Sequence, residues 1–150
     1  MTYYDLLGSA GRIGGATVLG LGAYVLYDLN YGSAYGYTLR GTLFTIYGKR
    51  YNQSTEAGQA VLRIHEAAHQ EGYGEVPAYR AMLNEINILL SRGTYGGGIF
   101  GGEARELTEC ETQQLIELRG AAQEGIEYYS KSYRERKAQD FSRFIYTYMY

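Results

Sequence analysis

The sequence predicts an α+β fold that is mainly helical, with a small β-sheet or hairpin preceding a helix that carries both histidines. Two observations favour it. Residues 37–47 are dense in β-branched and aromatic residues, and later segments place apolar residues at three- and four-residue spacing. The chain has 150 residues, enough for one compact domain with a buried core. Of these, 45% are hydrophobic and 20% charged, which excludes a disordered chain.

The charge balance and the cysteine count narrow the function classes. The 14 Lys+Arg and 16 Asp+Glu leave a net charge of −2, so bulk charge would not hold the chain on nucleic acid. We therefore expect no nucleic-acid partner. A single cysteine, Cys110, excludes an internal disulfide and a cysteine-cage zinc module. With 18 Tyr and no Trp, we expect tyrosine rings to carry much of the core volume.

Residues 1–36 form a Gly-rich apolar lead segment, and we expect the folded domain to comprise residues 37–150. The most apolar run, 13–27, has 15 residues, four of them glycine, and Asp28 follows it directly. A helix needs about 20 apolar residues to cross a bilayer. The run therefore favours a buried or membrane-grazing segment over a span, and membrane contact through 13–27 is an expectation.

The lead is expected to be irregular or partly helical, and better-defined elements follow it. Residues 37–47 predict one or two strands, with a bulge at Gly41. Apolar residues then recur at helical spacing from about Thr55 to Gln70, and Ser54 or Thr55 is the expected N-cap. Two glycines in the next four residues predict a tight turn.

A second helix is predicted from Glu75 to Ser91, antiparallel to the first. The segment 93–102 has six glycines and predicts a flexible connector, with a lid over a site as the alternative. Thr108 and Glu111 match a capping box, which begins a long amphipathic helix through about Ile126.

The residues that carry chemistry are the chain's two histidines, His65 and His69, with Glu66 between them. Positions i and i+4 of a helix project from one face, so both imidazoles reach a common ion. Imidazole nitrogen is a preferred zinc ligand. Glu66 lies about 100° around the helix, off the ligand row but close enough to act on a water molecule. This is the HExxH pattern of zinc metallopeptidases.

A catalytic zinc needs a third protein ligand, which must here be a carboxylate. If the chain folds back after the first helix, the residue opposite His69 lies near position 75 and the residue opposite His65 lies near position 79. Glu75 is therefore the expected third ligand. Glu85 would lie about 15 Å farther along the second helix. The acids left open as alternatives are Glu71, Glu85, Glu103, Glu106 and Glu109.

The sequence HEAAH at 65–69, followed by EVPAY at 75–79, resembles the gluzincin arrangement of HExxH and then Glu-x-x-Ala on the next helix. More narrowly, it is similar to compact metallopeptidase domains at the C-termini of bacterial polymorphic (Rhs-type) toxins. The similarity covers about residues 37–92. It implies a minimal zincin-like fold and a zinc-dependent metalloendopeptidase that cleaves a protein substrate.

The resemblance also implies roles and partners. Zn²⁺ held by His65, His69 and Glu75 would activate a water molecule, with Glu66 as general base. Tyr79 is the first candidate for a hydrogen-bond donor to the oxyanion. The implied setting is a secreted or delivered bacterial effector with a cognate immunity protein; without that resemblance, a cytoplasmic location is the expectation.

A second hypothesis comes from another class of protein. The apolar run at 13–27 and the aromatic C-terminus are also compatible with a non-enzymatic membrane-associated or assembly protein in which HExxH occurs by chance. Such a protein would bind no metal. Zinc binding therefore separates the two hypotheses.

Overall fold

The computed structural model describes residue 25 and residues 28–32, 34–97 and 102–149. The apolar run 13–27 lies outside this part of the chain, except for Val25, which is buried. Among the helices of the described residues, none has the length and apolarity needed to cross a membrane.

A small hairpin precedes the long helices. Strand β1 (Gly36–Thr38) pairs antiparallel with β2 (Thr45–Tyr47), and Tyr37 lies opposite Ile46. Gly41, predicted as a bulge, instead lies in the connecting turn with φ 76°, a conformation that glycine adopts without strain. Its N–H donates to the carbonyl of His69 at 2.9 Å, so the turn rests on the end of the next long helix.

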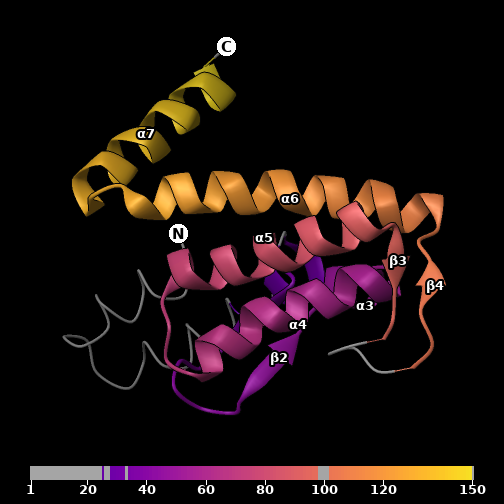
Figure 1. The fold of residues 1–150 in the computed structure, drawn as a ribbon. Coiled ribbons are helices and arrows are strands. Elements are labelled where there is room, and N and C mark those ends of the chain that lie inside the picture. Colours follow the sequence, from indigo (N-terminus) through magenta and orange to yellow (C-terminus); the bar gives the residue numbers. More distant parts are fainter. Residues whose placement is uncertain (1–24, 26–27, 33, 98–101, 150) are drawn as a thin grey trace.

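Three long helices form the body of the molecule. After the short α3 (Lys49–Asn52) come α4 (Glu56–Gln70), α5 (Glu75–Arg92) and α6 (Glu109–Ser130). Helix α5 lies between α4 and α6, and β2 lies beside α4 on the far side from α5 (Figure 1). The fully buried core side chains come from all three: Ala57, Val61, Ala78, Ile86, Leu115 and Ala122. The predicted α+β, mainly helical class is confirmed.

Helix ends follow the predicted capping residues. Thr55, one of the two expected N-caps, accepts a hydrogen bond from the Gly58 N–H at 3.1 Å. Thr108 and Glu111 form the predicted capping box of α6. Gly93 closes α5 in the left-handed conformation, with φ 67°.

The glycine-rich segment after α5 is flanked by a second hairpin that the sequence did not predict. Strand β3 (Thr94–Tyr95) pairs antiparallel with β4 (Arg105–Glu106). This hairpin follows the C-terminal end of α5, an 18-residue helix about 27 Å long, whereas Glu75 is its first residue. The position favours a connector over a lid on the histidine site.

The predicted long helix, α6, ends at Ser130, and a further helix, α7 (Tyr133–Met149), follows it in a different direction. Helix α7 projects away from the three-helix body (Figure 1). Its N-terminal half is tied to α6 by the Tyr128 hydroxyl, which donates to the carboxylate of Asp140 and lies 3.0 Å from both of its oxygens.

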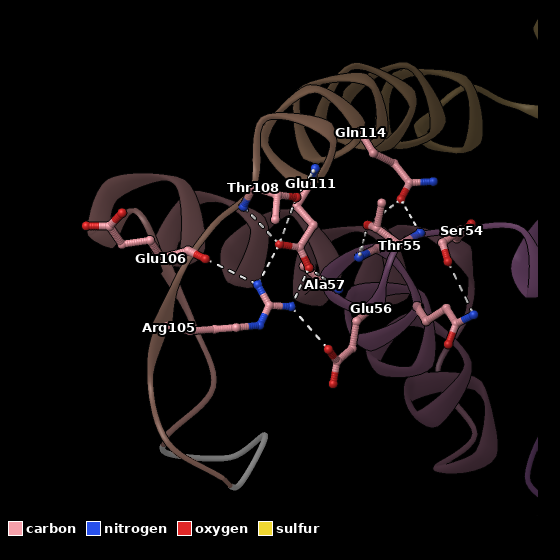
Figure 2. A network of polar contacts seen from close by, with 11 residues as sticks. Ser54, Thr55, Glu56, Ala57, Arg105, Glu106, Thr108, Glu111 and Gln114 are labelled. Carbon is pink, nitrogen blue, oxygen red and sulfur yellow. Dashed lines mark hydrogen bonds and ion pairs between the residues drawn. The ribbon is translucent and has the colours of Figure 1, made fainter.

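A polar network joins the beginnings of α4 and α6 to β4 (Figure 2). Glu111 accepts two hydrogen bonds from Arg105, each 2.7 Å long, and also accepts from the backbone N–H of Thr108 at 3.0 Å and of Ala57 at 3.4 Å. Arg105 also pairs with Glu56 at 3.1 Å. We call these five residues the Glu111 network. It fixes the end of the three-helix body that lies away from the histidines.

Candidate metal centre

Helix α4 presents His65 and His69 towards the beginning of α5. Their Nε2 atoms are 3.1 Å apart, because residues one helical turn apart share a face. Both side chains are buried, with His65 9% and His69 3% exposed. Two imidazole nitrogens thus converge in a sheltered site.

Glu75, the first residue of α5, completes the group. Its Oε2 atom lies 3.6 Å from Nε2 of His65 and 3.5 Å from Nε2 of His69. The antiparallel turn therefore brings position 75 opposite His69, as the sequence predicted. Among the described residues, this is the one group of three or more metal-ligating side chains close enough to hold an ion. It contains none of the alternative acids: Glu71, Glu85, Glu103, Glu106 and Glu109.

The three donor atoms have spacings suited to a tetrahedral ion. Ligands about 2.0–2.2 Å from zinc at tetrahedral angles lie about 3.3–3.6 Å from one another. The observed separations are 3.1, 3.5 and 3.6 Å. Two nitrogens and one carboxylate oxygen are also a donor set that zinc uses in catalytic sites. The residues present therefore fit a zinc ion.

A hydrogen bond outside the group of three donor atoms orients the ring of His69. Its Nδ1 lies 3.0 Å from the carbonyl oxygen of Tyr73, which only accepts, so Nδ1 carries a hydrogen, and in the neutral ring the lone pair is on Nε2, which faces the site. Burial acts to lower the pKa of His69, but the hydrogen bond and charge of Glu75 outweigh it and raise that pKa.

His65 differs from His69 in its surroundings. Burial lowers the pKa of His65 to about 4, against the opposing charge of Glu75, so its imidazole is neutral at pH 7. Within the described part of the chain, its buried Nδ1 atom has no hydrogen-bond partner. The neutral ring is the form that binds a metal.

Glu66 leaves α4 on the side that faces the β1–β2 hairpin. It is 7% exposed, and one carboxylate oxygen, Oε2, accepts a hydrogen bond from the buried hydroxyl of Thr38. Burial raises the pKa of Glu66, and the Thr38 hydrogen bond acts in the opposite direction. A carboxylate with a raised pKa next to the histidine group is suited to accepting and releasing a proton.

Tyr79 forms one wall of the site. Its ring centroid lies 4.4 Å from that of His65, with the planes tilted by 56°, and on its other side it stacks on Tyr129 at 6.0 Å. Burial raises the pKa of the phenol, which therefore stays protonated and able to donate at neutral pH. The ring contact with His65 is one of packing, and donation to an oxyanion remains a prediction.

Five further residues, from the first hairpin, the end of α4, the turn after it and α6, support this group and were not predicted. They are Thr38, Thr45, Gln70, Tyr73 and Gly125. The two threonines lay in the predicted strand, where β-branched residues are ordinary, so their hydroxyls gave no separate signal.

Comparisons with protein-family models, with curated proteins and with solved structures find no match for this chain.

Proposed function

We propose that this protein is a zinc-dependent metalloendopeptidase that cleaves a protein substrate. The observation that supports this proposal is the triangle of donor atoms from His65, His69 and Glu75, with sides of 3.1, 3.5 and 3.6 Å. The buried carboxylate of Glu66 follows His65 directly in the helix. Ligands plus a neighbouring base are the two parts that metal-assisted hydrolysis needs.

Each residue has a distinct role in this proposal. His65, His69 and Glu75 would hold the ion, which when bound supplies Lewis-acid activation of water and of the scissile carbonyl. Glu66 takes a proton from the water that attacks the carbonyl carbon, and donates it to the amide nitrogen as the C–N bond breaks. The carboxylate is thereby regenerated. Tyr79 is the proposed hydrogen-bond donor to the oxyanion.

Metal content and hydrolysis test this proposal together. We expect about one zinc per chain in the wild type, lost in the His65→Ala, His69→Ala and Glu75→Ala variants. Glu66→Gln should keep the zinc and lose about 10²–10⁴-fold in hydrolysis of a fluorescent peptide library. Glu71→Gln, which removes an exposed acid at the C-cap of α4, is the matched control and should behave as wild type.

A wild-type protein that takes up no zinc at neutral pH contradicts the proposal. So does a Glu66→Gln variant that hydrolyses peptides as fast as the wild type. The effector setting and an immunity partner belong to the same proposal and would be tested by toxicity of the wild type, but not of Glu66→Gln, on expression in bacteria.

One observation favours the alternative of a membrane-associated or assembly protein. At the turn of the β1–β2 hairpin, Leu43 is 89% and Phe44 60% exposed. Exposed apolar side chains at a loop tip are typical of contacts with a lipid surface or a partner. This alternative predicts sedimentation with lipid vesicles that Leu43→Ser abolishes, without zinc uptake.

A further inference from the structure

A row of hydrogen bonds runs from the end of α4 through both strands of the first hairpin and back to Glu66. Gln70 Nε2 lies 2.9 Å from Thr45 Oγ1, and Thr45 Oγ1 lies 2.7 Å from Thr38 Oγ1. The Thr38 hydroxyl in turn donates to Oε2 of Glu66. Thr38 and Thr45 are directly opposite in the β1–β2 register, which places their side chains on the same face.

The chemistry of the groups gives this row one direction. An ionised carboxylate only accepts hydrogen bonds, so Thr38 must donate its single hydroxyl hydrogen to Glu66. Thr38 can then only accept from Thr45, and Thr45 in turn must accept from the amide N–H of Gln70. A chain of hydroxyls polarised towards one acceptor strengthens each successive bond.

The other carboxylate oxygen of Glu66, Oε1, can accept a proton. Among the described residues, no group donates a hydrogen bond to Oε1. Oε1 lies 3.5 Å from the position that a Cβ atom on Gly36 would occupy, at the start of β1. One oxygen is thus anchored, while the second keeps its lone pairs.

We propose that Gln70, Thr45 and Thr38 form a one-directional hydrogen-bond chain that positions Glu66 for proton transfer. Thr38 is then a positioning residue, since it acts through Glu66. This inference rests on the proposed function for its catalytic consequence, but the chain itself has consequences in the metal-free protein. Thr38 is 4% exposed, so water would not replace its hydroxyl.

Two substitutions at Thr38 separate the hydroxyl from the shape of the side chain. Thr38→Val keeps the branched shape and removes the hydroxyl, whereas Thr38→Ser removes a methyl group and keeps the hydroxyl. We expect kcat for peptide hydrolysis to fall about tenfold in Thr38→Val, with KM and zinc affinity within about twofold of wild type. Thr38→Ser should retain kcat within about twofold. Equal kcat losses in the two variants, or none in Thr38→Val, overturn the proposal.

Unfolding of the metal-free protein tests the chain independently of activity. We expect Thr38→Val to lower the folding equilibrium constant at least about fivefold more when residue 66 is Glu than in the Glu66→Gln background. Gln70→Glu should act in the same direction as Thr38→Val, because a carboxylate there competes for the Thr45 hydroxyl hydrogen. Equal effects of Thr38→Val in both backgrounds overturn the chain.

The two measurements also distinguish the failure of this inference from that of the proposed function. If the wild type binds zinc and cleaves nothing, the metallopeptidase proposal fails, and the unfolding comparison alone decides whether the chain exists. If the wild type is active and Thr38→Val matches Thr38→Ser in kcat, the positioning role fails while the metallopeptidase proposal stands.

Discussion

Two buried carboxylates lie near opposite ends of α4, and their pKa values are shifted in opposite directions: Glu111 of α6 packs against the first turn of α4, and Glu66 belongs to its C-terminal half. Glu111 is 3% exposed and Glu66 is 7% exposed. Glu111 accepts two 2.7 Å bonds from Arg105 and further bonds from backbone N–H groups, and the Arg105 pairing lowers its pKa to about 2. Glu66 accepts from the Thr38 hydroxyl, and burial raises its pKa.

The difference is that the charge of Glu111 is paired with a cation, whereas Glu66 is the carboxylate to which we assign proton transfer in the proposed function. The negative charge of Glu111 is paired with Arg105, so Glu111 links α4, α6 and β4. The same pairing stabilises the ionised carboxylate over the protonated one. The charge of Glu66 is only partly compensated, which costs folding free energy and leaves the group ready to exchange a proton. Groups of the second kind gather at functional sites, and here the group lies beside three metal-ligating side chains.

The largest expected effect is a pair of opposite stability changes. Glu111→Gln removes the charge that Arg105 meets and leaves buried groups less well paired, so we expect unfolding free energy to fall by about 2 kcal/mol. Glu66→Gln removes a poorly compensated buried charge, so we expect the metal-free protein to be as stable as wild type or up to about 1 kcal/mol more stable. Urea unfolding at pH 7 measures both.

The two variants serve as controls for each other, because both replace a buried Glu by Gln. Equal destabilisation by both substitutions would contradict the contrast between the two carboxylates. Zinc affinity should be unchanged in Glu111→Gln, because the Glu111 network lies at the N-terminal end of α4, whereas His65 and His69 occupy its C-terminal half.

A smaller effect is expected in the pH dependence of stability. The pairing with Arg105 lowers the pKa of Glu111 to about 2 in the folded protein, below the unfolded value of about 4.3, so its stabilising contribution is complete at about pH 5 and above. As the pH falls from about 5 towards 2, the unfolded chain binds the proton first and the contribution is lost. We expect the stability difference between wild type and Glu111→Gln to shrink by about 1–2 kcal/mol over this window, after screening by solvent around the half-exposed Arg105.

Urea unfolding of both proteins at several pH values measures this effect. Taking the difference removes the titration of the other carboxylates, which both proteins share. A difference that stays constant from pH 5 to pH 2 would contradict the assignment of Glu111 as the stabilising carboxylate.

The sequence predicted the local parts of the site better than the contacts between elements. The i and i+4 spacing of His65 and His69 is a property of one helix, and the tight turn before Glu75 limits where the second helix begins. The capping box at Thr108 is local in the same way. By contrast, the pairing of Glu111 with Arg105 needs the second hairpin, whose two-residue strands leave no periodic pattern.

The hydrogen-bond chain from Gln70 through Thr45 and Thr38 to Glu66 could not be predicted from the sequence for a related reason. Thr38 and Glu66 are 28 residues apart, and their contact depends on how the first hairpin docks against α4. The error at Gly41 has the same origin, because a glycine within a β-rich segment fits a bulge or a turn equally well. The turn was favoured in the structure because the Gly41 N–H reaches the carbonyl at the end of α4.

The smallest effect concerns Gly120 and Gly125, two glycines in the interior of α6, where glycine lowers helix propensity. A Cβ atom at Gly125 would lie 2.6 Å from Cε2 of the Tyr79 ring, which packs between His65 and Tyr129. At Gly120, nothing in the described part of the chain lies within 4 Å of such an atom. We therefore expect Gly120→Ala to stabilise the protein by about 0.5–1 kcal/mol through helix propensity.

Gly125→Ala should destabilise the protein by about 1 kcal/mol, because overpacking of the ring exceeds the gain in helix propensity. The displaced ring of Tyr79 also presses on His65, so zinc affinity should fall in Gly125→Ala and stay at the wild-type value in Gly120→Ala. Urea unfolding and zinc titration of the two variants measure both effects. Equal stabilisation by both substitutions would mean that the Tyr79 ring moves aside without cost, and that α6 does not fix the position of this ring beside His65.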